Sequence, residues 1–127
     1  QLDIRDTDPA RRGSVMQAVR SDVETIAKHR GVHIAETIVN ADQPATCSPR
    51  IIGILDEICR ENGIAAKHMI SRAYHDSSFI AQIAPIAMMF IPCRGGVSHR
   101  PDEYAAPGDI ALGTRVLAAT LGKLASE

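Results

Sequence analysis

The sequence predicts an α/β fold, because short segments with the two-residue period of β-strands alternate with longer segments of helical periodicity. Residues 2–5 alternate apolar and polar side chains, as a half-buried strand does. Residues 9–30 then carry apolar side chains at helical spacing. The apolar run 86–91, bounded by two prolines, is typical of a strand buried on both faces.

Residues 1–43 are expected to form one strand-helix-strand unit. Asp8 and Pro9 predict the start of its helix, as N-cap and first helical residue, and Gly31 predicts the end. Residues 32–39 alternate again and predict the second strand. Such a unit is too small to stand alone, because one helix covers only one face of a short sheet.

We expect a domain boundary near residue 44, so that residues 44–127 form a second part. Ser48-Pro49 predicts the start of a helix that Asn62-Gly63 ends. A short strand over 67–70, a helix capped by Asp76, the strand 86–91 and a polar loop over 93–109 follow. The final helix carries one apolar side, formed by Ile110, Leu112, Val116, Leu117, Leu121 and Leu124.

Composition limits the partners that the chain is expected to bind. Its 127 residues, 45% of them hydrophobic, suffice for one ordinary domain or for the pieces of two. Lys and Arg number 14 against 15 Asp and Glu, and they are scattered, so neither nucleic acid nor an anionic membrane is an expected partner. No apolar run approaches the roughly 20 residues that span a bilayer, and no signal peptide is visible, which favours a cytoplasmic protein. Three cysteines without CxxC spacing are expected to be reduced thiols.

Three polar side chains are candidates for chemistry. His75 and His99 follow predicted strands at the carboxyl ends where α/β proteins bind ligands. His99 could ligate a metal or lie in a surface turn, and His75 could bind an anion at a helix start or simply pack beside the cap Asp76. Arg5 could grip a carboxylate, or pair with an acidic neighbour in the chain.

The chain resembles the C-terminal portion of a dinuclear-metal amidohydrolase family. The resemblance rests on Leu-Asp-Ile-Arg-Asp-Thr-Asp-Pro at the start, Ser-Arg-Ala-Tyr-His-Asp-Ser-Ser-Phe, Phe-Ile-Pro-Cys-Arg-Gly-Gly-Val-Ser-His-Arg-Pro-Asp-Glu-Tyr and the last helix. The family contains N-carbamoyl-L-amino acid hydrolases, allantoate amidohydrolases and ureidoglycolate amidohydrolases. It implies that residues 1–43 are half of a ferredoxin-like lid and dimerisation domain, and that residues 44–127 end a metallopeptidase-like α/β catalytic domain.

The resemblance also implies roles for single residues. His99 matches a metal ligand, Arg5 matches a lid arginine that grips the substrate carboxylate, and Tyr74 and His75 match a loop that contacts substrate. Two divalent ions, Mn²⁺ or Zn²⁺, are implied for each complete subunit, together with a homodimer. The chain lacks a match for the bridging aspartate and for the glutamate general base, so we expect it to be an incomplete and inactive segment of the enzyme.

One departure within the motif concerns the substrate. Where carbamoylases and most allantoate enzymes have small residues, this chain has Arg72, Tyr74 and Ser77, a version most similar to ureidoglycolate amidohydrolases. Tyr74 would shrink the pocket and add a phenol, which suits a small hydroxylated ureido acid. Ureidoglycolate is therefore the expected substrate, with allantoate or an N-carbamoyl amino acid as the alternative. A non-catalytic dimerisation module is the rival hypothesis from another class.

Overall fold

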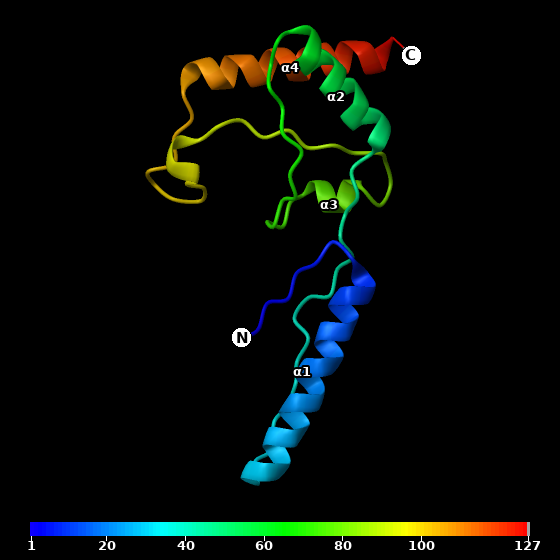
Figure 1. Ribbon diagram of the computed structural model, residues 1–127, viewed down its shortest axis with the longest axis vertical. Coiled ribbons are helices and arrows are strands. Elements are labelled where there is room, and N and C mark those ends of the chain that lie inside the picture. The colour runs from blue at the N-terminus through cyan, green and yellow to red at the C-terminus, as the bar shows by residue number, and fades with distance from the viewer. Residues whose placement is uncertain (127) are drawn as a thin grey trace. The chain divides into compact units, whose positions relative to one another are not determined.

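The computed structural model describes residues 1–126, which form helices joined by irregular segments (Figure 1). The long helices are α1 (Pro9–Arg30), α2 (Pro49–Glu61) and α4 (Pro107–Ala125). The short elements are the single-turn helix α3 (Ser77–Ile80) and the 3₁₀ turn η1 (Arg94–Gly96). The chain divides into two compact units, Gln1–Ala45 and Thr46–Glu127.

In the first unit, α1 begins and ends where local sequence signals predict. The Asp8 carboxylate accepts hydrogen bonds from the amides of Ala10 and Arg11 and so caps amide groups that the helix itself leaves unpaired. At the other end Gly31 adopts a left-handed conformation, with φ 63°, which costs glycine little.

The segment after Gly31 runs back beside α1 (Figure 1). Glu36 on this segment forms an ion pair with Arg20 on the helix. The Asp42 carbonyl accepts a hydrogen bond of 2.6 Å from the Arg12 guanidinium. None of residues 1–45 is buried, so polar contacts rather than an apolar core hold this unit together.

The strands that the sequence predicts are not formed. None of the described residues 1–126 lies in a β-strand, and the segments 2–5, 32–39, 67–70 and 86–91 are irregular. A strand needs backbone hydrogen bonds to a neighbouring strand, and these segments have no such ladder within the described residues. The expected α/β alternation is therefore not confirmed, although α1 and α2 lie where helices were predicted and α4 begins at Pro107, within the loop predicted over 93–109.

In the second unit the core lies between α2 and α4. The α2 side chains Ile54, Ile58 and Cys59 are buried against Val116 of α4, because their spacing places them on one helix face. Thr120 is also buried, and its hydroxyl donates to the Val116 carbonyl at 2.8 Å. Three partly buried side chains extend this core: Leu55, Ile64 and Leu124.

The apolar side predicted for α4 is only partly covered. Val116 is buried, whereas Ile110, Leu117 and Leu121 are about half exposed. These three side chains therefore form an exposed apolar stripe beside the buried one.

The segment 86–91 packs on α4 at Gly113. A Cβ atom built on Gly113 would lie 2.5 Å from Cγ2 of Ile91, so the missing side chain lets the helix and the segment approach closely. The Ile86 carbonyl also accepts a hydrogen bond of 2.6 Å from the Ser48 amide, which joins this segment to the start of α2. The segment that leads into the His99 loop is thus anchored at both ends.

The expected helix cap at Asp76 is not formed. Asp76 has helical dihedral angles, φ −57° and ψ −29°, and its side chain makes no capping hydrogen bond. The helix α3 that follows has only four residues. A single turn aligns too few peptide dipoles to create an anion site, so a helix dipole does not explain a role for His75.

Candidate functional site

His75 lies in the loop before α3 and is held on two sides. Its Nε2 atom lies 2.6 Å from the Ser71 hydroxyl oxygen, and its ring lies 5.9 Å from the ring of Phe90. The imidazole is half-buried. Its neighbour Tyr74 is about half exposed and meets Phe79 edge to face, with ring centroids 5.7 Å apart. Together they present a phenol and an imidazole from one short loop.

His99 lies in an exposed loop after η1 and has a left-handed backbone, with φ 59°. This conformation is uncommon for a residue other than glycine, and it persists where other contacts fix it. The Glu103 carboxylate supplies that contact, because it accepts the His99 amide at 2.7 Å. The Glu103 amide in turn donates to the Arg100 carbonyl at 3.0 Å.

Arg5 lies in the other unit, is exposed and pairs with Asp3, an acidic neighbour in the chain. Its Nε and Nη2 atoms donate to both carboxylate oxygens of Asp3, with Nη2 to Oδ2 at 2.6 Å. These hydrogen bonds and the positive charge hold the pKa of Asp3 below its ordinary value. The guanidinium fork therefore already has the bidentate geometry that carboxylate capture requires.

The described residues do not form a metal centre. Within residues 1–126, no three His, Cys, Asp or Glu side chains come together closely enough to hold a metal ion. No described contact joins His99 to His75 within residues 46–126. His99 alone supplies one donor, whereas a tight site for Mn²⁺ or Zn²⁺ needs several. The chain's own residues therefore do not fit a complete metal site.

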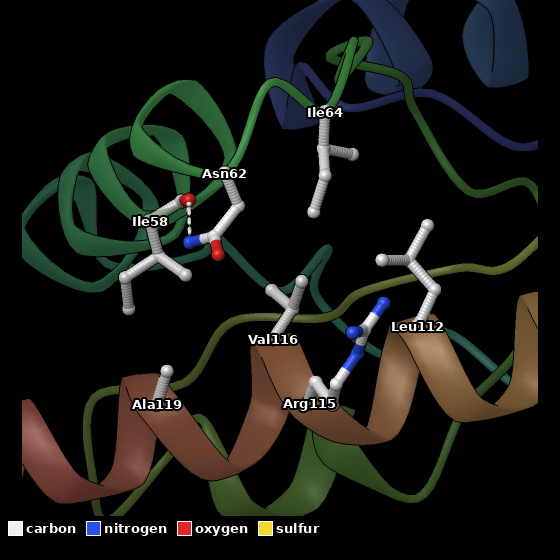
Figure 2. Close-up of a pocket in the computed structure, with 7 residues that line it drawn as sticks. All are labelled: Ile58, Asn62, Ile64, Leu112, Arg115, Val116 and Ala119. Carbon is white, nitrogen blue, oxygen red and sulfur yellow. Dashed lines mark hydrogen bonds between the residues drawn. The ribbon is translucent and has the colours of Figure 1, made fainter.

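Two hollows in the second unit are lined by other side chains. One lies between α2 and α4, where Asn62 turns back to the Ile58 carbonyl and Leu112, Arg115 and Val116 line the opposite wall (Figure 2). Its volume of about 170 Å³ is below the range usual for ligand pockets. The other is an open hollow lined by Pro92, Cys93, Arg94, Tyr104, Ala106 and Asp109. Neither contains a predicted site residue.

Two supporting residues were missed by sequence reasoning. Ser71 lies four residues before His75, and Glu103 lies four residues after His99. That spacing inside a polar loop is the signal that could have found them, because four loop residues suffice to bring a side chain back onto the chain.

Comparison with known proteins identifies the family of this chain. The family described as Peptidase family M20/M25/M40 matches residues 9–123, and the chain belongs to it. Enzymes of this family generally depend on two metal ions. The resemblance found from the two histidine motifs is confirmed.

Two of the most similar relatives are a hydrolase and an amidohydrolase. The chain is 47% identical over 128 residues to the ureidoglycolate hydrolase of Arabidopsis thaliana, covering 100% of this chain and 27% of that protein. It is 37% identical over 116 residues to an N-carbamoyl-L-amino-acid amidohydrolase of Pseudomonas sp. (strain NS671), covering 91% of this chain and 28% of that protein. The chain thus spans about a quarter of the length of the curated relatives it matches.

Solved structures agree with this assignment. Crystal structures of AtUAH in complex with glyoxylate and in complex with (S)-hydroxyglycine are each 47% identical to this chain, with a TM-score of 0.83. The similarity covers 97% of this chain and 29% of the AtUAH chain.

Proposed function

We propose that the complete protein carrying this chain is a metal-dependent hydrolase that cleaves a C–N bond of ureidoglycolate. The observation that carries the proposal is the 47% identity to a ureidoglycolate hydrolase over the whole chain. The ligands of AtUAH support it chemically, because glyoxylate and (S)-hydroxyglycine share a carboxylate next to a carbon that bears oxygen. Ureidoglycolate has the same half, with a ureido group attached to that carbon.

In this proposal each loop has one task. Arg5 binds the substrate carboxylate with the fork that it now presents to Asp3. Tyr74 and His75 orient the ureido group through the phenol and the imidazole. His99 is one of several metal ligands, and its backbone is preset by Glu103.

The cofactor in this proposal is a pair of Mn²⁺ or Zn²⁺ ions per complete subunit. Such ions would polarise the ureido carbonyl and activate water. The remaining ligands and the glutamate general base lie outside this chain, so its residues bind and orient substrate rather than carry out the proton transfers.

The same proposal covers the domains. Residues 1–43 form half of a lid and dimerisation domain, and residues 44–127 end the α/β catalytic domain. Residues 1–45 expose large apolar side chains, with Leu2 65% and Val39 85% exposed, which supports a covering neighbour such as a second subunit. In the complete protein the segments 2–5, 32–39, 67–70 and 86–91 pair with strands from elsewhere.

We further propose a cytoplasmic location. Cys47, Cys59 and Cys93 are all free thiols, as expected in a reducing compartment. Separately, no helix within residues 1–126 combines the length and the apolar composition needed to cross a membrane.

Ammonia release tests the substrate. The complete protein, supplied with Mn²⁺, is incubated in parallel with ureidoglycolate, allantoate and an N-carbamoyl amino acid. We expect ureidoglycolate to give the highest kcat/KM. Preference for either other substrate would support the corresponding alternative, and no release from any of the three would favour the non-catalytic dimerisation module.

Variants test the roles. Arg5→Ala should raise KM for ureidoglycolate about 10- to 100-fold, because this factor corresponds to the free energy of a hydrogen bond to a charged group. Arg20→Ala, which removes another exposed and paired arginine of the same unit, is the matched control and should leave KM unchanged. His99→Ala should lower metal content measured by elemental analysis, whereas His68→Ala, at an exposed histidine paired with Asp56, should not. Unchanged KM or unchanged metal content would refute the respective role.

A further inference from the structure

The contact between Ser71 and His75 is short, local and doubly supported. The Ser71 hydroxyl oxygen lies 2.6 Å from Nε2 of His75, and both side chains are half-buried. The amide of Ala73 donates to the same hydroxyl oxygen at 3.2 Å. Phe90 lies beside the imidazole on the other side, with ring planes tilted by 55°. Both the serine oxygen and the plane of the imidazole are thus held in place.

Counting protons decides the direction of this hydrogen bond. A serine oxygen has one proton to donate and two lone pairs that accept. The Ala73 amide already occupies one lone pair. For the Ser71 proton, Nε2 of His75 is the acceptor within reach in the described part of the chain. If Nε2 donated instead, the half-buried serine proton would lose this partner, so donation by serine satisfies more groups.

We propose that Ser71 is a positioning residue that holds His75 in the tautomer with its proton on Nδ1. When one ring nitrogen of a neutral imidazole accepts a hydrogen bond, the other carries the proton. His75 then offers an Nδ1–H donor, and the described residues provide no partner for it. A fixed donor of this kind suits a carbonyl oxygen.

The consequence for catalysis rests on the proposed function. A ureido carbonyl is a hydrogen-bond acceptor, so a donor held at Nδ1 would orient it. Without Ser71 the imidazole exchanges between tautomers, and only part of the population presents the proton at Nδ1. The loss of one hydrogen bond of ordinary net strength corresponds to about a three- to tenfold lower kcat/KM.

Nitrogen NMR on the complete protein tests the tautomer without any substrate. Selective ¹⁵N-histidine labelling limits the signals to imidazole nitrogens, and His75→Gln identifies the resonances of interest. At about pH 8, where imidazoles are ordinarily neutral, we expect protonated Nδ1 and unprotonated Nε2. Ser71→Ala should shift the population toward the Nε2–H form, and Ser71→Thr, which keeps a hydroxyl, should restore the original pattern. An Nε2–H form of His75 in the unsubstituted complete protein, or no change in Ser71→Ala, would overturn the proposal.

Kinetics on the complete protein test the catalytic consequence. Ser71→Ala should lower kcat/KM for ureidoglycolate about three- to tenfold, with recovery in Ser71→Thr. Ser78→Ala removes a neighbouring half-buried hydroxyl but keeps the backbone amide that donates to the His75 carbonyl at 2.9 Å, so it should leave kcat/KM unchanged. Equal losses in Ser71→Ala and Ser78→Ala would refute the positioning role. If the unsubstituted complete protein releases no ammonia from ureidoglycolate, the proposed function fails, while the NMR result still decides the tautomer.

Discussion

Replacing Gly113 by alanine tests how closely α4 packs on the segment that leads to the His99 loop. An added Cβ atom would lie 2.5 Å from Cγ2 of Ile91 and 3.7 Å from Cε of Met89. The Cγ2 atom belongs to a β-branched side chain with few rotamers, so it cannot simply swing away. The substitution therefore forces either α4 or the segment 86–91 to move.

Two opposing terms set the expected size of this effect. Alanine is about 1 kcal/mol more favourable than glycine in a helix interior. Overpacking of a filled contact typically costs about 1–3 kcal/mol. We therefore expect Gly113→Ala to lower the free energy of unfolding by up to about 2 kcal/mol. Gly122 on the same helix has no atom within 4 Å of an added Cβ, so Gly122→Ala should raise the free energy of unfolding by up to about 1 kcal/mol.

Urea unfolding followed by helical circular dichroism measures both variants against the unsubstituted chain. The two substitutions add the same atoms to the same helix, so the difference between them isolates the contact with Ile91. In thermal unfolding followed by the same signal, the midpoint temperatures of the two variants should move in opposite directions, by about 4–8 °C per kcal/mol for a unit of this size. If Gly113→Ala proves as stabilising as Gly122→Ala, α4 does not lie against Ile91 and the packing is refuted.

Three further outcomes are expected. The Lys123 ammonium, through its hydrogen bond and its charge, holds the pKa of Glu57 below the ordinary 4.5. Their ion pair therefore stabilises the fold above that pH, and this stabilisation is lost as the pH falls through the lowered pKa. Lys123→Ala should make the free energy of unfolding fall less steeply at acid pH, and an unchanged slope would show that the ion pair does not stabilise the fold. Glu103→Ala should speed hydrogen exchange of the His99 amide by at least about threefold, whereas Glu103→Gln keeps an acceptor and should change the exchange rate less. Equal exchange rates in the two variants would contradict the hydrogen bond from the His99 amide to Glu103. Asp8→Ala should destabilise α1 by about 1 kcal/mol, whereas Asp8→Asn should retain most of the stabilisation that the cap provides. Hydrogen exchange of the amides in the first turn of α1 measures both effects, and equal protection in the two variants would refute the capping role of Asp8.

The helices were predictable from sequence because their signals are local. Asp8-Pro9 and Gly31 bound α1, and Ser48-Pro49 and Asn62-Gly63 bound α2. Each signal acts within one turn of the backbone, so it needs no information from distant residues.

The strands and the supporting contacts were not predictable in the same way. The run 86–91 has the composition of a buried strand, but a strand also needs a partner ladder, and that partner is not contained in its own sequence. Asp76 has the residue type of a cap, yet its helical dihedral angles prevent capping. The contacts of Ser71 and Glu103 depend on loop conformation, which residue type alone does not determine. The family resemblance identified the site residues as candidates because a motif preserves residue identity even where its packing cannot be derived.

The loop around His99 gets its shape from contacts made within itself. His99 bonds to Glu103, Glu103 returns to Arg100, and Arg100 pairs with Asp102, so these bonds join residues no more than four positions apart. Such a loop can keep its conformation when residues in the elements on either side are substituted. Changes of length within the loop should be tolerated less well. Inserting or deleting one residue between His99 and Glu103 would disrupt all of these bonds at once. The Arg94 amide also donates to the Tyr104 carbonyl at 2.8 Å, so natural variation in length is expected before Arg94 or after Tyr104, and not between them.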